Sequence, residues 1–265
     1  MFVGVPIVSN KKGFTLIELL VVIAIFAMLM SVLMPALAKA RAQGKAVVCL
    51  SNLRQMFIAS QSYAANHDDY YPSAYLPDPD PLDALMVTRA WDFVTAEDWN
   101  TKEVISEPGI LWESDGVGEI QQCPSFKGKS NTKEEYSGYN YNVSYIGHGY
   151  TETTKMPVRV SDVANGASNA IFGDGQYYDG ANKFMRSPFP EDGVDEFSFR
   201  AAGTQGYRHS NKTNVAWCDG HVSSQRELYT ETIPSQQELI LQYNLENPNN
   251  KVGFLSPDNS SYDLR

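Results

Sequence analysis

The 265-residue sequence predicts an α+β fold, in which one long N-terminal helix packs on an antiparallel β-sheet with elaborated loops. Two features of the chain predict this arrangement. Residues 14–34 form a long apolar run, and helix-forming residues continue from it to about residue 65. Residues 66–265 instead alternate short strand-like runs with turn signals, and they hold most of the chain's 19 glycines and 14 prolines.

The composition excludes several classes of protein. Hydrophobic residues make up 43% of the chain and charged residues 20%, which excludes wholesale disorder. The same composition argues against a collagen, a disulfide-dense miniprotein and a protein with many membrane spans. The formal net charge of −10 repels phosphate, so we expect no nucleic-acid partner.

Residues 14–34 are predicted to form a transmembrane helix. A helix of this length spans roughly 30 Å, which matches the hydrocarbon thickness of a bilayer. Lys11 and Lys12 precede the run, and Glu18 lies within it. A secretory signal peptide is the alternative, but the apolar run is long for one and no small-x-small site follows directly. An acid inside a membrane span is costly and is usually retained for a function.

The segment around this acid, KKGFTLIELLVV at residues 11–22, resembles the processing segment of type IV pilins and type II secretion pseudopilins. The resemblance implies a prepilin leader at residues 1–13, which a prepilin peptidase removes by cutting after Gly13. It also implies methylation of the new N-terminus, Phe14, and a transmembrane and assembly helix at residues 14–35.

The same resemblance implies roles for Glu18 and Pro35, which occupy positions where the family carries Glu and Pro. The family's glutamate is thought to meet the terminal amine of a neighbouring subunit. Such an ammonium partner would offset much of the cost of a carboxylate in lipid. Pro35 removes one backbone hydrogen bond and is expected to kink the helix without ending it. The implied partners are other pilin-like subunits, bound through the N-terminal helix.

The charges flanking the span predict a location. Lys11 and Lys12 are expected to stay in the cytoplasm, because positive residues do so. The chain is then a single-pass protein of the bacterial inner membrane, with its body on the periplasmic or extracytoplasmic side, and it joins a filament after assembly.

We expect no enzyme, because the chain has no G-x-S-x-G, H-E-x-x-H or P-loop motif.

Residues 36–65 are predicted to continue the helix into the body as an amphipathic segment. Apolar or small residues recur every three or four positions, with lysines and arginines on the other faces. This stripe comprises Leu37, Ala40, Gly44, Val47, Leu50, Leu53 and Phe57. We expect it to pack on the body, because the heptad pattern of a free coiled coil does not persist.

The predicted globular domain, residues 66–265, begins with a loop rich in proline and aspartate at residues 68–83. Two short helices are predicted next, at residues 82–93 and 95–104. Strands are predicted between turn signals at residues 139–146, 169–172, 214–218 and 221–224.

The remaining parts of the domain carry weaker patterns. Residues 176–203 are predicted to form a long irregular loop, and residues 236–243 a short helix. The last twenty residues are predicted to be poorly ordered.

Motifs in this domain resemble a pilin-like family of planctomycetes, verrucomicrobia and their relatives. The C-terminal motif is His209, nine further residues, and then Asp219-Gly220. The other shared motifs are CLSNLRQ at residues 49–55, Cys123-Pro124, SGYN at residues 137–140 and FGD at residues 172–174. This resemblance covers most of the chain and implies its architecture more than its task.

The three cysteines allow three single pairings. A body on the oxidising side of the membrane permits a disulfide, and we predict Cys49 with Cys123, since this bond would pin the helix to the sheet. Three free thiols are the alternative. Without a C-x-x-C pair, the sequence gives only a weak indication of a zinc or redox site.

The most chemical-looking group comprises His209, Asp219 and His221, to which Asp174 adds a carboxylate. Imidazole and carboxylate bind divalent metals. The structural alternative is favoured, because Asp219-Gly220 is also what a tight hairpin turn requires. No cofactor is expected, although calcium is an alternative at the loop acids, without EF-hand spacing. Those acids are Asp78, Asp80 and Asp83, or Asp174, Asp179 and Asp192.

The sequence therefore predicts a pilin-like structural subunit that assembles into a type II secretion pseudopilus or a related filament. The size of the body favours a secretion-type or minor subunit over a major pilus subunit. The alternative is a membrane-tethered binding protein for a glycan or an exported protein, which uses the same export route. Irregular loops and aromatic residues that are able to stack on sugars motivate this alternative. The aromatic residues are Trp91, Trp99, Trp112, Tyr177 and Tyr178.

Overall fold

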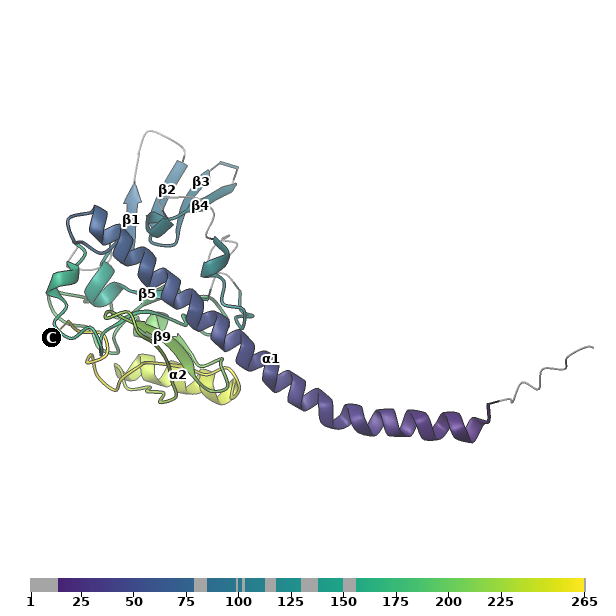
Figure 1. The fold of residues 1–265 in the computed structure, drawn as a ribbon. Helices are drawn as coiled ribbons and strands as arrows, with labels where there is room; N and C mark the ends of the chain where they lie inside the picture. Colours follow the sequence, from purple (N-terminus) through teal and green to yellow (C-terminus); the bar gives the residue numbers. More distant parts are fainter. Residues whose placement is uncertain are drawn as a thin grey trace, which may run out of the picture. The chain divides into compact units, whose positions relative to one another are not determined.

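The computed structural model describes residues 14–78, 85–98, 100–101, 103–112, 118–129, 138–149 and 156–264. The chain divides into two compact units, Met1–Gln43 and Gly44–Arg265. Helix α1, Leu16–Asn66, is continuous through Pro35 and contributes to both units (Figure 1). It ends within one residue of the predicted position. Asp68 and Asp69 follow it with positive φ angles of 51° and 69°, which a continuing helix does not allow.

The part of α1 that belongs to the second unit packs on the body through one face. Its buried residues are Cys49, Asn52, Leu53, Met56, Phe57, Ser60 and Ala64. The predicted stripe was right for Leu53 and Phe57. It was wrong for Leu37, Ala40, Gly44 and Val47, which are exposed. The buried face also includes small polar residues such as Ser60, which donates a hydrogen bond to the Phe57 carbonyl at 2.7 Å. A search for apolar spacing alone therefore missed part of this face.

A five-stranded sheet forms the centre of the body, in the order β10-β9-β6-β5-β7. Its strands are β5 Asn140–Asn142, β6 Ala170–Gly173, β7 Phe184–Met185, β9 Thr213–Trp217 and β10 Val222–Gln225. The predicted β6, β9 and β10 are confirmed. The predicted strand at residues 139–146 stops at Asn142, whose side chain accepts a hydrogen bond from the Tyr145 backbone N–H at 3.1 Å. That bond caps a π-helical turn, Val143–Gly147.

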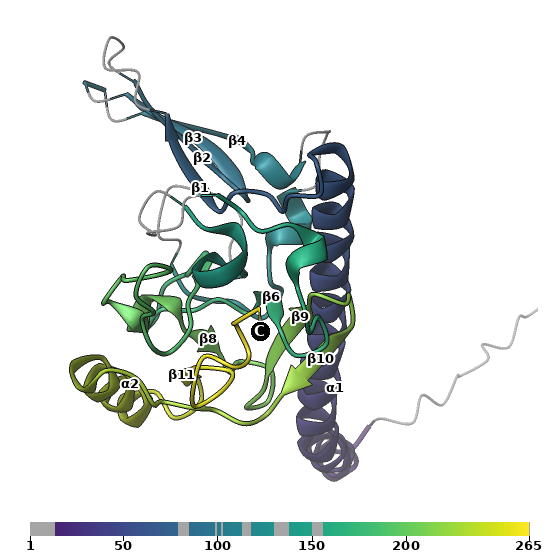
Figure 2. The same ribbon diagram turned by 90° about the vertical axis from the view of Figure 1, so that its left-hand side faces the viewer.

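A second sheet is antiparallel with the order β1-β2-β3-β4 (Figures 1 and 2). Its strands are β1 Tyr75–Asp78, β2 Leu85–Ala90, β3 Phe93–Asp98 and β4 Val104–Pro108. The two predicted helices and part of the predicted loop were wrong here. Val94 and Thr95 favour strands, and the tight turn at Trp91-Asp92 makes hairpin pairing local.

The C-terminal residues are ordered, contrary to prediction. Helix α2, Pro234–Glu246, contains the predicted helical segment, and β11, Val252–Gly253, pairs with β8, Gln205–Gly206. Beyond them Phe254 and Tyr262 are fully buried, and the Tyr262 hydroxyl accepts a hydrogen bond from the Leu255 N–H at 2.8 Å. A few large buried side chains thus attach the polar C-terminal segment to the body.

The segment at residues 176–203 is mostly irregular, as predicted, but it is tied to the body by buried charges. Asp195 contacts Arg186 at 3.0 Å and Arg200 at 2.9 Å, and all three side chains are buried. The Ser144 hydroxyl donates a further hydrogen bond to Asp195 at 2.5 Å. The main core beside this network is aromatic, and in it Trp91, Tyr141 and Phe172 lie in mutual ring contact.

Candidate functional site

The first site predicted from the sequence is the N-terminal end of α1. Phe14 is exposed and is the first described residue, while Gly13 and the rest of the predicted leader lie outside the described residues. Thr15 directly precedes the helix. Its backbone N–H and its hydroxyl each donate a hydrogen bond to Glu18 Oε2 at 2.8 Å, and the Glu18 N–H donates to Thr15 Oγ1 at 3.3 Å.

These reciprocal bonds form a capping box, which satisfies backbone N–H groups that the first helical turn leaves free. Glu18 therefore has a local structural role in the isolated chain. The T-x-x-E pattern at residues 15–18 is a sequence signal for this role, which was not among the predictions for Glu18.

The apolar residues that follow are exposed, in contrast to those of the body. Leu16, Val32 and Leu33 expose two-thirds or more of their surface. Among the described residues, α1 is the one helix that is long and apolar enough to cross a membrane. Its internal polar residue Ser31 donates a hydrogen bond to the Met28 carbonyl at 2.7 Å, so no polar group of that side chain needs water. This part of the helix needs cover from lipid or from other protein.

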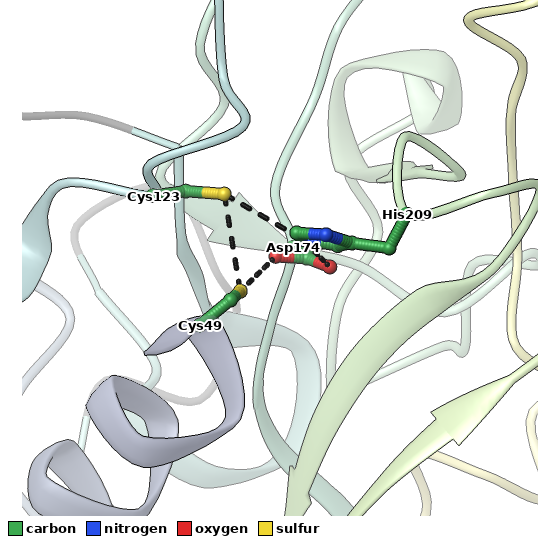
Figure 3. A group of neighbouring side chains, drawn as sticks. All are labelled: Cys49, Cys123, Asp174 and His209. Carbon is green, nitrogen blue, oxygen red and sulfur yellow. Dashed lines mark hydrogen bonds and ion pairs between the residues drawn. The ribbon is translucent and has the colours of Figure 1, made fainter. Parts of the chain in front are cut away.

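The second site is a buried cluster that comprises Cys49, Cys123, Asp174 and His209 (Figure 3). Cys49 Sγ lies 2.9 Å from Asp174 Oδ1 and 3.8 Å from Cys123 Sγ. His209 Nε2 lies 3.6 Å from Cys123 Sγ and 3.2 Å from Asp174 Oδ2. The four candidate ligand atoms all lie within 4.8 Å of one another.

Four separate segments deliver these side chains. Cys49 comes from α1, and Cys123 follows the 3₁₀ turn Gly118–Gln121. Asp174 directly follows β6, and His209 lies in the turn between β8 and β9. The Asn214 N–H of β9 donates to Asp174 Oδ2 at 2.7 Å, which fixes the carboxylate.

Arg208 supplies a positive charge beside the cluster. Its guanidinium lies 3.1 Å from Asp174 Oδ1 and 3.3 Å from Cys123 Sγ. It also donates to the Gly175 carbonyl at 3.2 Å and to the Gly138 carbonyl. A buried carboxylate is therefore paired with a buried cation, as its burial requires.

The proton affinities reflect this packing. Burial alone would raise the pKa of Asp174, but Arg208 and His209 lower it below its usual value. Burial raises the pKa of the Cys49 thiol, and the neighbouring Cys123 and Asp174 raise it further. Burial disfavours the charged form of His209, yet hydrogen bonding to Asp174 and Cys123 raises its pKa to about 9.

The predicted disulfide residues are adjacent, but their sulfur atoms are not bonded and all three cysteines are free thiols here. A bond between Cys49 and Cys123 stays a prediction. Cys218, the third cysteine, is buried elsewhere, where burial raises the pKa of its thiol to about 12.

The predicted histidine–aspartate group is divided between two places. His209 and Asp174 join the buried cysteines, whereas Asp219 and His221 form an exposed pair with Oδ1 and Nδ1 2.7 Å apart. Gly220 between them has a φ of +88°, and the Asp219 carboxylate accepts from the His221 N–H at 3.0 Å. This pair therefore shapes the β9–β10 turn, in agreement with the structural alternative.

The calcium alternative gains no support from the described residues. Asp174 faces Arg208 and His209, while Asp179 and Asp192 are exposed and belong to no ligand group. Asp80 and Asp83 lie outside the described residues, as does the side chain of Asp78.

The cysteine pair was expected, but its meeting with Asp174 and His209 was missed. Neighbouring members of this group along the chain are separated by between 35 and 74 positions, so no ligand spacing is visible in the sequence. One sequence signal could have grouped them. Each of the four residues lies within or beside a short motif that resembles the pilin-like family of planctomycetes, verrucomicrobia and their relatives.

Comparison with known proteins bears on the N-terminal segment. Residues 8–34 match the prokaryotic N-terminal methylation motif. A 61-residue stretch is 43% identical to the type IV wide pilus major component PilA4 of Thermus thermophilus, and covers 23% of this chain and 47% of that relative. The chain thus spans about half the length of the curated relative that it matches. No solved structure matches the chain significantly.

The methylation motif lies on the N-terminal segment for which processing was predicted, and the structure adds a long apolar helix followed by antiparallel sheets. The chain therefore resembles type IV pilins in its N-terminal methylation motif and in its arrangement of one long apolar helix and antiparallel sheets.

Proposed function

We propose that this protein is a structural subunit that is cleaved after Gly13, methylated on Phe14 and assembled into a filament through residues 14–34. The observation that carries the proposal is the exposed apolar surface of α1. Burial of apolar surface is worth roughly 25 cal/mol per Å², so this helix is stable in lipid or among other helices and not in water. The N-terminal methylation motif supports processing at the start of that helix.

The proposed order of events follows from the properties of the helix. The prepilin is inserted into the inner membrane with its body outside the cytoplasm, and a prepilin peptidase then removes the leader. The new amine at Phe14 lies close in sequence to Glu18, so subunits stacked side by side bring the amine of one to the carboxylate of another. A charge pair in a low-dielectric layer is selective for register, because a misaligned subunit leaves both charges unpaired.

The large body favours a secretion pseudopilus or a minor pilus subunit within this proposal. The described part of the body has three β-sheets and many irregular segments, which is an elaborate surface for a subunit that only builds a shaft. We expect no catalytic role.

Four of the five aromatic residues that motivated the tethered-binding alternative are described, and they do not form an exposed stacking platform. Trp91 and Trp112 are buried, and Tyr177 and Tyr178 pack on one another and on Phe199 and Tyr243. Trp99 lies outside the described residues. The filament subunit is therefore the function that the described side chains favour.

The test is the intact mass of the protein from native membranes, with mapping of its N-terminal peptide. We expect a chain that begins at methylated Phe14 and that sediments with sheared surface or periplasmic filaments. A chain that retains residues 1–13 would make the protein a plain signal anchor. A correctly processed chain that never enters a polymer would favour the tethered-binding alternative.

A further inference from the structure

We propose that Cys49, Cys123, Asp174 and His209 form a tetrahedral site for a divalent transition metal of the zinc class. The proposal does not depend on processing or assembly, because all four residues lie within the unit Gly44–Arg265. It rests on the identity of the donors, their separations, their burial and the charge around them.

The donors are suited to zinc. Thiolate, imidazole and carboxylate are its usual protein ligands, and closed sites with four protein ligands are structural sites. His209 presents Nε2 to the cluster, whereas its Nδ1 is buried and has no hydrogen-bond partner among the described residues. The ring is therefore oriented entirely by the cluster.

The separations match the edges of a zinc tetrahedron. With Zn–S near 2.3 Å and Zn–N and Zn–O near 2.0–2.1 Å, the edges are about 3.8 Å for S–S, about 3.6 Å for S–N and about 3.3 Å for N–O. The corresponding distances here are 3.8, 3.6 and 3.2 Å. The 3.2 Å distance is to Asp174 Oδ2, whereas Cys49 Sγ lies 2.9 Å from the other oxygen, Oδ1, which is shorter than the ideal edge of about 3.5 Å. We therefore expect the carboxylate to turn so that one oxygen faces both Cys49 and His209 when a metal enters.

The charge of the loaded site sums to zero. A dication, two thiolates and one carboxylate leave a net charge of −1 with a neutral imidazole, and the guanidinium of Arg208 cancels it. Arg208 lies within 3.3 Å of one sulfur ligand and 3.1 Å of the carboxylate. A buried site that is neutral overall avoids the large cost of burying net charge.

A disulfide between Cys49 and Cys123 is the competing state of the two thiols. The side chains around the two sulfurs favour the metal-bound state over this disulfide. A disulfide uses only the two sulfurs, and it does not require a carboxylate and an imidazole to converge on them. The metal also needs both thiols reduced, so the two states exclude each other in any one molecule.

The test uses the full-length chain in detergent, purified without chelators. Its metal content is measured by mass spectrometry, and the reduced apoprotein is then titrated with Co²⁺ alone. We expect about one metal per chain, and with Co²⁺ the intense visible bands of tetrahedral coordination and a thiolate charge-transfer band. This readout on the wild-type chain needs no variant.

Matched variants assign the ligands. Cys49→Ser and Cys123→Ser each are expected to lose the charge-transfer intensity of one thiolate and to bind Co²⁺ at least tenfold more weakly, and His209→Gln to distort the visible bands. Cys218→Ser removes the third cysteine, outside the cluster, and is expected to bind as the wild type does.

Three results would overturn the proposal. The first is a metal-free native protein whose peptides show a Cys49–Cys123 disulfide. The second is a reduced apoprotein that takes up no Co²⁺, and the third is a cobalt spectrum unchanged by Cys49→Ser and Cys123→Ser.

Discussion

Glu18 has one role in the structure and a second role in the filament proposal. Its carboxylate closes a capping box with Thr15 in the isolated chain. The filament proposal requires the same carboxylate to pair with an amine in another subunit. The two roles differ in what they demand, because capping needs only a hydrogen-bond acceptor and pairing needs a negative charge.

Substitutions at these two positions separate the roles. We predict that Glu18→Gln keeps the cap but fails to enter filaments, that Glu18→Ala loses both, and that Thr15→Val loses the cap yet still assembles. Filament yield in sheared fractions, with membrane insertion as the control, measures each outcome. Normal assembly of Glu18→Gln would show that the charge is dispensable.

Asp195 is the residue whose loss is predicted to cost the body most. It is buried between Arg186 and Arg200, so its removal takes a counter-ion away from two buried cations. We predict that Asp195→Ala lowers the free energy of unfolding by about 3–5 kcal/mol, as measured by urea denaturation. The exposed Glu238→Ala is the control and is predicted to change it by less than about 0.5 kcal/mol.

The same residue gives a pH dependence with a definite sign. Burial would raise the pKa of Asp195, but Arg186 and Arg200 lower it below its usual value. The folded state therefore binds this proton less readily than the unfolded chain does. The stabilisation is fully present above the ordinary aspartate range and is lost as the pH falls through the folded pKa. Asp195→Asn is expected to weaken this acid dependence, and an unchanged slope would contradict the assignment.

At the scale of elements, helix α1 meets the central sheet through the β9–β10 turn. Arg54 donates a hydrogen bond to the Gly220 carbonyl, and the Gly220 Cα lies beside the Phe57 ring. A Cβ at Gly220 would lie 2.5 Å from Phe57 Cε1, and the φ of +88° already disfavours any side chain. This turn explains physically why the Asp219-Gly220 pair is needed.

Gly220→Ala is therefore predicted to destabilise the body by more than the roughly 1 kcal/mol that backbone strain alone costs. Gly193→Ala is the matched control, since Gly193 also has a positive φ of 76° but has nothing within 4 Å of the added Cβ. Thermal melts compare the two variants, because Gly193→Ala adds only backbone strain and Gly220→Ala adds the same strain and a steric clash. Equal shifts in melting temperature would mean that the helix yields to the added methyl group.

The elements also show where prediction from the sequence fails. Strands β6, β9 and β10 were found because short apolar runs end at turn residues. Strands β2 and β3 were mistaken for helices, because their stability comes from pairing with neighbouring strands and not from a one-face hydrophobic pattern. Order near Tyr262 was missed for a similar reason, since most of the buried residues in its cluster, such as Tyr145 and Ala170, are distant in sequence.

At the scale of the whole molecule, the division at residue 43/44 defines what is able to fold without a membrane. We predict that a fragment of residues 44–265 is soluble, monomeric and folded, because its core is contained within it. A fragment that begins at Gln55 is predicted to unfold, since it lacks Cys49 and Leu53, which are fully buried. Circular dichroism and size exclusion compare the two. A stable shorter fragment would show that the first helical turns on the body contribute little.

The sequence by itself determined which features the N-terminal segment of this protein has. A processing motif, an acid in an apolar run and the length of that run are local properties, and the methylation motif match supports their interpretation. The tertiary structure decided the rest. Cys49, Cys123, Asp174 and His209 are joined by the packing of α1 on the central sheet, and no spacing along the chain records that meeting. Local patterns determine which secondary structure or environment a segment prefers. A buried site depends instead on which distant segments pack against one another and so exclude water.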